Sequence, residues 1–194
     1  MAKKLFSSIS LLLLFTILFG FFYPTLIFFC GKVFFPKKAS GSLVYLKGDL
    51  IGSKLIGQNF SKDSYFHPRP SFAGIHGYDA RNSGASNLAS TSSILKQKTQ
   101  QAAEIYRKIN RLPPDAKVPV DAITASASGL DPHISLENAL LQLPRVALAR
   151  NLEEKDLRAL ILEHLEKPTF SLFGENRINV LMLNLALDQF AEAH

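Results

Sequence analysis

A twelve-residue stretch, Thr124–Ser135, gathers the residue types from which a hydrolytic site is built. Ser126 and Ser128 offer a nucleophilic hydroxyl, His133 offers a base, and Asp131 offers a carboxylate to orient that base. Residues this close in sequence cannot easily place nucleophile, base and orienting group in line, and the G-x-S-x-G motif is absent. The residue types therefore suggest hydrolysis, but their spacing argues against it.

The same stretch fits a tight turn that holds parts of a domain together. Gly129 can adopt a positive φ at little steric cost, and the proline after Asp131 fixes one φ angle and favours extended backbone before it. Asp131 can accept backbone N–H groups, His133 can bridge two segments, and Ser135 can cap a helix. We predict that residues 128–135 form a rigid turn that starts a helix and docks the layers of the domain.

Other reactive residue types give weaker signals. His67, His76 and Asp79 are separated by prolines and glycines, so their spacing matches no compact metal site. We predict no metal, and structural hydrogen bonds for His67 and Arg69. The sequence also lacks the phosphate-binding motifs G-x-x-x-x-G-K-[ST] and G-x-G-x-x-G. The formal net charge of +6 falls to +1 without the five lysines that flank the N-terminal apolar segment, so no nucleic-acid surface is predicted.

The N-terminal segment is apolar enough to cross a membrane. Leu5–Gly31 has 27 residues without a formal charge, and about 20 suffice to cross the hydrocarbon core. A cleaved signal peptide would have a shorter apolar core, typically ~7–15 residues, and a small-x-small cleavage site, and neither feature is present. Bulky Phe28 and Phe29 disfavour lipid modification of Cys30. We predict one transmembrane helix.

The lysines do not decide the orientation of this helix, because they flank both of its ends. The long C-terminal part can be translocated largely regardless of charge, which favours an external domain. Gly20 and Pro24 predict a local bend. One face carries a stripe of apolar side chains that either packs against another transmembrane helix or faces lipid. The stripe comprises Phe15, Phe19, Phe22, Leu26 and Phe29.

Strand and loop patterns follow the apolar segment. Leu43–Leu46 and Leu50–Ile56, joined by a turn at Lys47-Gly48-Asp49, predict a β-hairpin. Tyr65–Pro70 contains two prolines and is expected to run extended, outside regular sheet pairing. Residues 78–88 are rich in side chains that bond their own backbone, so we predict an ordered loop there.

Helical periodicity then recurs in four segments. The first helix runs from Ser93 to Leu112 and is capped by Ser92 or Ser93. The second is capped by Ser135, runs through Ala147 and is kinked at Pro144. The third has Asn151 and Glu154 as its capping box, runs through Leu165 and ends at Pro168, and the terminal helix is capped by Asn179 and runs to Phe190. Between the first two, Val118–Ile123 predicts a brief apolar strand.

These elements predict an α+β protein. A single N-terminal transmembrane helix is followed by one mixed α/β extracytoplasmic domain with a small sheet and about four helices. The expected boundaries are residues 1–35 for the cytoplasmic tail and anchor, 36–42 for a linker, and 43–194 for the domain.

Seven motifs are spread between residues 52 and 188. They are GSKLIGQ at 52–58, YFHPRPS at 65–71, YDA at 78–80, SG at 83–84 with SNL at 86–88, TAS at 124–126 with SGLDPHIS at 128–135, RVA at 145–147 with AR at 149–150, and NVL at 179–181 with LNLALD at 183–188. Together they resemble the KdpC family, the C subunit of the Kdp potassium-transporting P-type ATPase.

The resemblance singles out a set of positions as the structural signature of the family. These are His67, Arg69, Tyr78, Asp79, Asn87, Ser128, Gly129, Asp131, His133, Ser135, Arg145, Asn179 and Asn184. No catalytic residue and no metal ligand is implied among them, and the nucleotide-binding residues are left unspecified.

The resemblance implies a noncatalytic subunit of the bacterial inner membrane, with a cytoplasmic N-terminus and its main domain outside the cytoplasm. The implied partners are membrane lipid and the A, B and F components of the Kdp complex, which are respectively a potassium-binding channel-like protein, a P-type ATPase and a small single-span protein. The implied role is assembly and stabilisation of a high-affinity potassium uptake complex.

The family is also described as a catalytic chaperone that raises the ATP affinity of the P-type ATPase component. ATP is therefore implied as a ligand, with no intrinsic cofactor. The alternative is a stand-alone membrane-anchored extracytoplasmic binding module.

Overall fold

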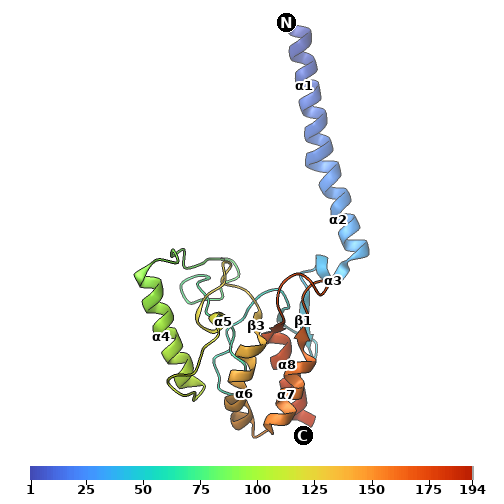
Figure 1. Ribbon diagram of the computed structural model, residues 1–194. Helices are drawn as coiled ribbons and strands as arrows, with labels where there is room; N and C mark the ends of the chain where they lie inside the picture. The colour runs from blue at the N-terminus through green and yellow to red at the C-terminus, as the bar shows by residue number, and fades with distance from the viewer. Residues whose placement is uncertain (194) are drawn as a thin grey trace. The chain divides into compact units, whose positions relative to one another are not determined.

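The computed structural model describes residues 1–193, which form two compact units, Met1–Ser53 and the chain from Lys54 onward. The first unit contains α1 (Ala2–Ile17), η1 (Leu18–Phe22), α2 (Tyr23–Phe34), α3 (Pro36–Ala39), β1 (Leu43–Leu46) and β2 (Asp49–Ser53) (Figure 1). The second contains α4 (Ser93–Ile109), α5 (Val120–Ile123), β3 (His133–Ser135), α6 (Leu136–Arg150), α7 (Glu154–Glu163), β4 (Leu165–Glu166), β5 (Arg177–Asn179) and α8 (Val180–Ala193). The predicted α+β class is confirmed.

The first three helical elements form one continuous helix, Ala2–Phe34, which is 33 residues long. It is long and apolar enough to cross a membrane, as the uncharged stretch Leu5–Gly31 within it predicts. Pro24 has no N–H to donate to the carbonyl of Gly20. The N–H of Tyr23 bonds instead to Leu18 O, five residues back. A short π-helical turn, η1, therefore lies where the local bend was predicted, and the bend itself stays a prediction.

The predicted hairpin is present, with a shorter second strand than expected. β1 and β2 pair antiparallel and are joined by Lys47-Gly48, both at positive φ, which matches the right-handed twist of paired strands. The register shifts between Val44 and Tyr45, where Ile51 of β2 is the extra residue of a bulge. β2 ends at Ser53, whose hydroxyl donates to Gly41 O (2.7 Å), so the predicted continuation to Ile56 is wrong.

Three short strands form the sheet of the second unit, in the order β3-β5-β4 and antiparallel throughout. Ile178 of β5 lies opposite Ile134 of β3 on one side and opposite Leu165 of β4 on the other. β3 runs directly into α6, and β5 runs directly into α8. The sheet therefore fixes where two long helices begin.

The hydrophobic core of the second unit is formed by this sheet, by α6, α7 and α8, and by one loop residue. Its buried members are Phe66, Ile134, Ala139, Leu143, Val146, Ala147, Leu157, Leu160, Ile161, Ile178, Val180, Leu183 and Leu187. Burying one large apolar side chain contributes about 1.5–3 kcal/mol. Phe66 is 0% exposed, so the loop that carries it is anchored through the core.

The predicted helix caps are confirmed at three helices. The capping pairs are Ser92 Oγ with Leu95 N–H (3.4 Å) at α4, Ser135 Oγ with Asn138 N–H (3.1 Å) at α6, and Asn179 Oδ1 with Met182 N–H (3.1 Å) at α8. α6 continues through Pro144, and the kink there stays a prediction. His133–Ser135 is a strand, so the turn predicted for residues 128–135 is shorter than expected.

The strand predicted for Val118–Ile123 is wrong, because Val120–Ile123 forms one turn of helix. Pro119 precedes this turn in extended backbone (ψ 147°). A proline lacks the N–H that a strand ladder needs, but it is well tolerated beside the start of a helix. Asp121 lies in the first turn, where the helix dipole favours a carboxylate.

The capping box predicted at Asn151 and Glu154 is also wrong. Asn151 has a left-handed φ of 55° and closes α6, a position that suits asparagine. α7 follows Glu153 without a side-chain cap. The helix ends at Glu163, earlier than predicted, because Leu165–Glu166 pairs with β5 as a strand.

Candidate functional site

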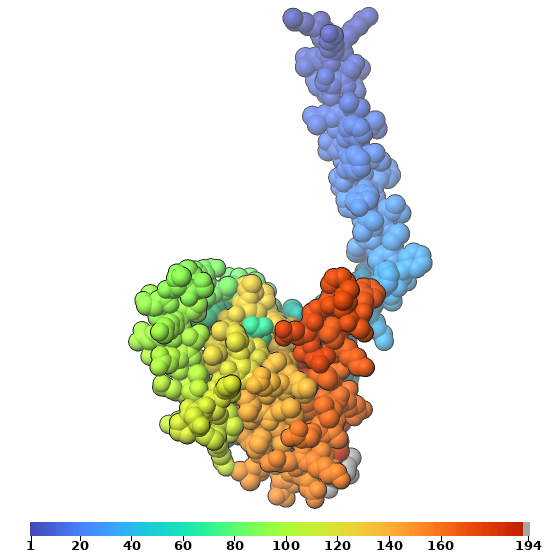
Figure 2. All heavy atoms as spheres, in the orientation of Figure 1, coloured from blue at the N-terminus to red at the C-terminus, as the bar shows by residue number. Residues whose placement is uncertain are grey.

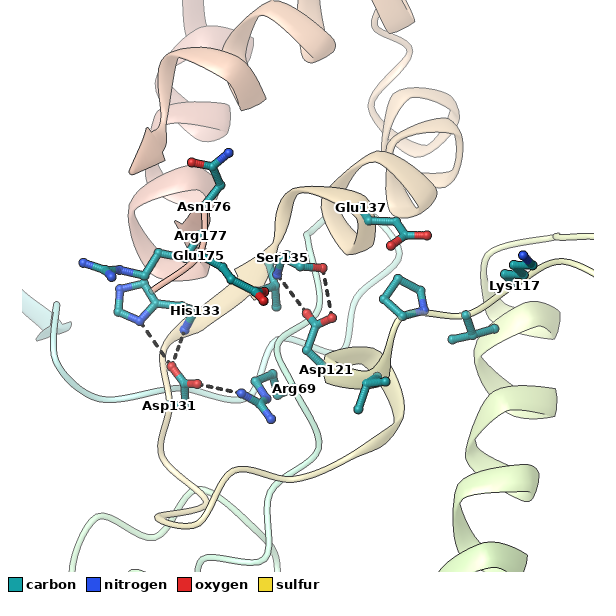
Figure 3. Close-up of a pocket in the computed structure, with 14 residues that line it drawn as sticks. Arg69, Lys117, Asp121, Asp131, His133, Ser135, Glu137, Glu175, Asn176 and Arg177 are labelled. Carbon is teal, nitrogen blue, oxygen red and sulfur yellow. Dashed lines mark hydrogen bonds and ion pairs between the residues drawn. The ribbon is translucent and has the colours of Figure 1, made fainter. Parts of the chain in front are cut away.

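A cleft of about 690 Å³ opens on the second unit beside β3 (Figure 3). Its walls come from residues 117–121 around the start of α5, from residues 131–135, from residues 175–177 at the start of β5, and from Arg69 and Glu137. The lining carries four carboxylates, Asp121, Asp131, Glu137 and Glu175, and three strong bases, Arg69, Lys117 and Arg177. The cleft is therefore polar and of mixed charge.

Asp131 is the centre of the contacts in this cleft. Its Oδ2 accepts Arg69 Nη1 at 2.8 Å, and its Oδ1 lies 3.0 Å from the backbone N and 3.2 Å from ring Nδ1 of His133. Burial alone would raise the pKa of this carboxyl, but the hydrogen bonds from His133 and the charge of Arg69 outweigh it and hold the pKa below its ordinary value. Asp131 is therefore charged and already paired at neutral pH.

The second ring nitrogen of His133 extends this network to the sheet. His133 Nε2 lies 3.8 Å from Glu166 Oε2, and the same oxygen accepts Arg177 Nε at 3.0 Å. Bases and acids thus alternate along a row from Arg69 through Asp131, His133 and Glu166 to Arg177. The row links the loop before β3 with β4 and β5.

The two serines of the supposed hydrolytic group have other contacts. The hydroxyls of Ser126 and Ser128 lie 3.3 Å from each other, and Ser128 Oγ accepts the N–H of Leu130 at 3.1 Å. Both ring nitrogens of His133 are directed at acids, Asp131 and Glu166. The arrangement is that of a self-paired charge network, not of a nucleophile poised beside its base.

A second carboxylate ties α5 to the start of α6. Asp121 accepts the backbone N–H of Ser135 (2.8 Å), its hydroxyl (2.9 Å) and Asn138 Nδ2 (2.9 Å). Because Ser135 also caps α6, Asp121 holds the helix N-terminus through its cap. Asp121 was not among the predicted site residues, because the segment around it was predicted to be a strand.

Next to Arg69, Ser71 joins three loops. Its hydroxyl donates to Gly129 O (2.6 Å) and accepts the N–H groups of Ala73 (3.1 Å) and Tyr78 (2.8 Å). The Tyr78 hydroxyl donates to Arg69 O (2.6 Å), and burial raises the pKa of Tyr78 to about 12. Ser71, Tyr78 and Gly129 therefore hold Arg69 in place for its contact with Asp131.

Ser128 completes this junction through its backbone. Its carbonyl oxygen accepts the N–H of Gly84 (3.0 Å) and the hydroxyl of Ser83 (2.9 Å). The predicted docking turn thus contacts residues 83–84 through the carbonyl of Ser128 and Ser71 through the carbonyl of Gly129. Gly129 has a left-handed φ of 67°.

Arg145 lies in the core, 3% exposed, and crosses from α6 to the loop before Phe66. Its Nη1 donates to the carbonyl oxygens of Asp63 and Tyr65, its Nε to Asn110 Oδ1 (2.9 Å), and its Nη2 to Gln142 Oε1 (2.8 Å). Burial lowers the pKa of this guanidinium, although arginine remains charged. A buried charge is thus satisfied by four oxygen acceptors of the unit itself.

Two amide side chains hold the extended segment Tyr65–Pro70. Asn184 of α8 accepts the N–H of Phe66 (2.9 Å) and donates to its carbonyl (3.0 Å). Gln142 of α6 accepts the N–H of His67 (2.7 Å) and donates to its carbonyl (3.1 Å). Successive residues of an extended chain face opposite sides, so α8 and α6 satisfy a backbone that two prolines keep out of a sheet. Burial lowers the pKa of the His67 imidazole.

The predicted signature residues therefore fall into separate groups. Arg69, Asp131, His133 and Ser135 line the cleft. Tyr78, Ser128 and Gly129 form the junction of loops around Ser71. Arg145 and Asn184 hold the segment that contains His67 against α6 and α8. Asn179 caps α8 and donates to Lys54 O (2.8 Å). Asp79 accepts Arg81 N–H within its own loop (3.0 Å), and Asn87 is an exposed left-handed residue.

Comparison with known proteins assigns the chain to a family. The family model described as "KdpC: K+-transporting ATPase, c chain" matches residues 5–189. The chain belongs to the KdpC family. The resemblance seen in its motifs is thereby confirmed.

Three relatives, each named potassium-transporting ATPase KdpC subunit, illustrate the similarity to KdpC proteins. The protein of Mycobacterium tuberculosis (strain H37Rv) is 47% identical over 189 residues, covering 97% of this chain and all of the relative. That of Nitratidesulfovibrio vulgaris is 50% identical over 171 residues, covering 87% and 85%. That of Photorhabdus laumondii is 47% identical over 186 residues, covering 96% of each.

Two residues that build the site in this KdpC-family chain, Asn138 and Gln142, were not predicted from the sequence, whereas the neighbouring Arg145 was among the predicted signature positions. Asn138, Gln142 and Arg145 lie at positions i, i+4 and i+7 of α6, and all three are buried. A polar stripe at helical spacing inside an apolar face was a signal that could have found them. Arg150, the last residue of α6, donates to Ser64 O (2.8 Å) and to Asp188 Oδ1 (2.6 Å).

We predict that Asp131→Asn lowers the melting temperature of this KdpC protein at neutral pH, because Arg69 and His133 lose a charged acceptor, at a cost of about 1–3 kcal/mol. A carboxyl group whose pKa is lower in the folded state than in the unfolded state stabilises the fold at pH values above its unfolded pKa of about 3.9. That stabilisation is lost as the pH falls through the folded-state pKa. The melting temperatures of parent and variant, measured from pH 7 down to pH 3, should therefore converge at the acid end.

A constant difference between the two proteins across that range would contradict the assignment of Asp131 as the charged centre. A second comparison uses Asp131→Ala. Unchanged melting at pH 7 together with lost assembly of the transport complex would mean that this residue contacts a partner and does not brace the fold.

Proposed function

We propose that this chain is the accessory subunit of a potassium-transporting ATPase complex. The observation that carries the proposal is the KdpC family match over residues 5–189, which includes the apolar helix and nearly all of the second unit. The proposed partners are the A, B and F components of the Kdp complex, namely the potassium-binding channel-like protein, the P-type ATPase and the small single-span protein. In a cell that depends on this complex, deleting the chain should abolish growth at limiting potassium, and the full-length chain should restore it.

The proposed role is assembly and stabilisation of the complex, with no chemical step on the second unit. The cleft arginines pair with acids of the same unit, Arg69 with Asp131 and Arg177 with Glu166. The buried Arg145 is occupied by acceptors from α6, from Asn110 and from the loop before Phe66. The internal pairing of the two cleft arginines and of the buried Arg145 supports a structural role.

ATP is implied by the family resemblance, but the cleft residues do not fit a nucleoside triphosphate. A phosphate chain is usually held by converging cations or by backbone N–H groups at a helix start. Four carboxylates face this cleft, and two of its three strong bases already pair with acids. We therefore propose that any effect of this chain on the ATP affinity of the P-type ATPase component is transmitted through contact between the two proteins.

We propose that the helix crosses the bacterial inner membrane once, with a cytoplasmic N-terminus and an external second unit. One 33-residue apolar helix and a long folded part that can be translocated regardless of charge support this orientation. A cysteine placed at exposed Ser90 in a Cys30→Ala chain should react with a membrane-impermeant maleimide in intact cells. Reaction only after lysis would place the unit in the cytoplasm.

The aromatic stripe of the helix is proposed to contact a transmembrane helix of another protein of the complex. Its members are exposed in the first unit, from 46% at Phe15 to 60% at Phe19. Converting Phe19, Phe22 and Phe29 to Leu should preserve membrane insertion but reduce the yield of the assembled complex several-fold, because shape complementarity is lost. Phe6, Phe21 and Phe28 converted to Leu form the control, since they lie off the stripe. Equal yields from both triple variants would refute the contact.

A further inference from the structure

Residues 168–174 form an exposed apolar loop between β4 and β5 that takes no part in the cleft. Phe170 is 90% exposed, Leu172 75% and Phe173 64%. No charged residue occurs from Pro168 to Gly174. Figure 2 shows this part of the chain, coloured orange-red, as a lobe that stands out from the surface of the second unit. Large apolar side chains gathered at one exposed point mark an interaction site.

Part of the backbone of this loop is hydrogen-bonded within the loop itself. Thr169 and Phe173 exchange both of their main-chain hydrogen bonds, at 2.9 and 3.0 Å. The N–H of Ser171 bonds to Pro168 O (2.9 Å), and the N–H of Leu172 bonds to Thr169 O (3.2 Å). Internal pairing matters most in an apolar medium, where no water is present to satisfy free N–H and C=O groups. This internal pairing lowers the number of backbone groups that would lose a hydrogen bond to water if the tip entered lipid.

The tip also carries unfavourable backbone. Phe170 and Ser171 have left-handed φ values of 55° and 57°, a backbone conformation that residues other than glycine rarely adopt. Such strain persists where the surrounding structure imposes it, and it gathers at functional segments. Here it belongs to the two residues at the centre of the exposed loop.

We propose that this loop inserts its apolar tip into the interfacial layer of the bilayer that the chain's own helix spans. The 20 residues from Phe34 to Lys54 can extend by at most about 3.5 Å each, so the second unit stays within about 70 Å of the bilayer. This tether gives the loop a high effective concentration at the lipid surface. The absence of charge from residue 168 to 174 favours lipid over a polar protein surface.

Lys167 stands at the edge of the uncharged tip and is exposed. A lysine in that position can reach lipid phosphates while the aromatic rings lie deeper. The proposal requires no particular orientation of the transmembrane helix, since either leaflet offers the same interface, and it is independent of the proposed role in potassium transport.

The test uses the full-length Cys30→Ala chain with one cysteine, Ser171→Cys, labelled with the polarity-sensitive fluorophore NBD. The protein is reconstituted alone in vesicles of phosphatidylethanolamine and phosphatidylglycerol that contain spin-labelled lipid. We expect blue-shifted emission and at least twofold quenching by lipid labelled near the head group, with weaker quenching by lipid labelled deep in the chain.

A second variant removes the apolar tip by Phe170→Ser and Leu172→Ser, and it keeps the same probe. Both side chains are exposed, so the fold should persist, which near-UV circular dichroism checks. Lipid quenching should then fall at least twofold. Water-like emission of the parent probe, or quenching unaffected by the two serines, would overturn the proposal. So would a probe that becomes shielded only when the partner proteins are added and that lipid does not quench, because the occupant would then be a protein.

Discussion

Replacing Arg145 by Met should lower the free energy of unfolding of the second unit by about 3–5 kcal/mol, a large part of the 5–15 kcal/mol that keeps a typical domain folded. The guanidinium supplies hydrogen bonds to the carbonyls of Asp63 and Tyr65 and to Asn110 and Gln142. Methionine fills a similar volume but donates none of them. Each buried acceptor left unpaired costs about 1–3 kcal/mol.

The measurement is chemical denaturation of the full-length protein, followed by near-UV circular dichroism because the chain has no tryptophan. Hydrogen exchange adds a local readout, since the amides of Phe66 and His67 bond to side chains next to this network. Arg145→Lys should recover only part of the loss, because an ammonium cannot span four acceptors as a planar guanidinium does. Arg158→Met, on the exposed face of α7, is the matched control. Equal stability of the Arg145→Met and Arg158→Met proteins would contradict the central role of Arg145.

Gly129→Ala should destabilise the second unit by about 3 kcal/mol or more, because two costs coincide at this position. The backbone is left-handed, with φ at 67°, and a Cβ would lie 2.5 Å from Gly84 O and 2.8 Å from Ala73 N. Both neighbours are main-chain atoms, so neither can move aside as a flexible side chain would. The expected result is a lower melting temperature together with loosening of the three-loop junction at Ser71.

Two other glycines separate these costs. Gly174 has a left-handed φ of 91° but nothing within 4 Å of an added Cβ, so alanine there should cost only about 1 kcal/mol. Gly57 carries no positive φ, but a Cβ would lie 2.8 Å from Asp131 O. Its alanine variant should therefore report the clash alone. If Gly129→Ala melts no lower than Gly174→Ala, the close approach at the junction is not a constraint.

Helices with caps and regular apolar spacing were predictable from the sequence. α4, α6 and α8 begin where Ser92, Ser135 and Asn179 stand, because local side-chain capping and a long apolar face act together there. The apolar helix was equally plain, since length and lack of charge suffice to predict it. Where signals were short, prediction failed. Val118–Ile123 became a helical turn, and Asn151 closed one helix instead of starting the next.

The site was predictable in its residues but not in its contacts. His67, Asp131, Arg145 and the other signature positions came from family motifs, which name residues without pairing them. The pairing depends on contacts such as Arg69 with Asp131, 62 residues apart, and Asn184 with Phe66, 118 apart. Local periodicity carries no information on such separations. Asp121 shows the same limit, because its role depends on a short helix that the pattern did not indicate.

Affinity purification of the tagged full-length chain after mild detergent extraction would show whether the chain is a subunit of the Kdp complex. We expect the channel-like protein, the P-type ATPase and the small single-span protein of the Kdp complex to copurify in fixed proportion, and we expect the purified material to hydrolyse ATP in response to potassium. Recovery of the chain as a lone monomer, from cells that express these three partners, would contradict its assignment to that complex.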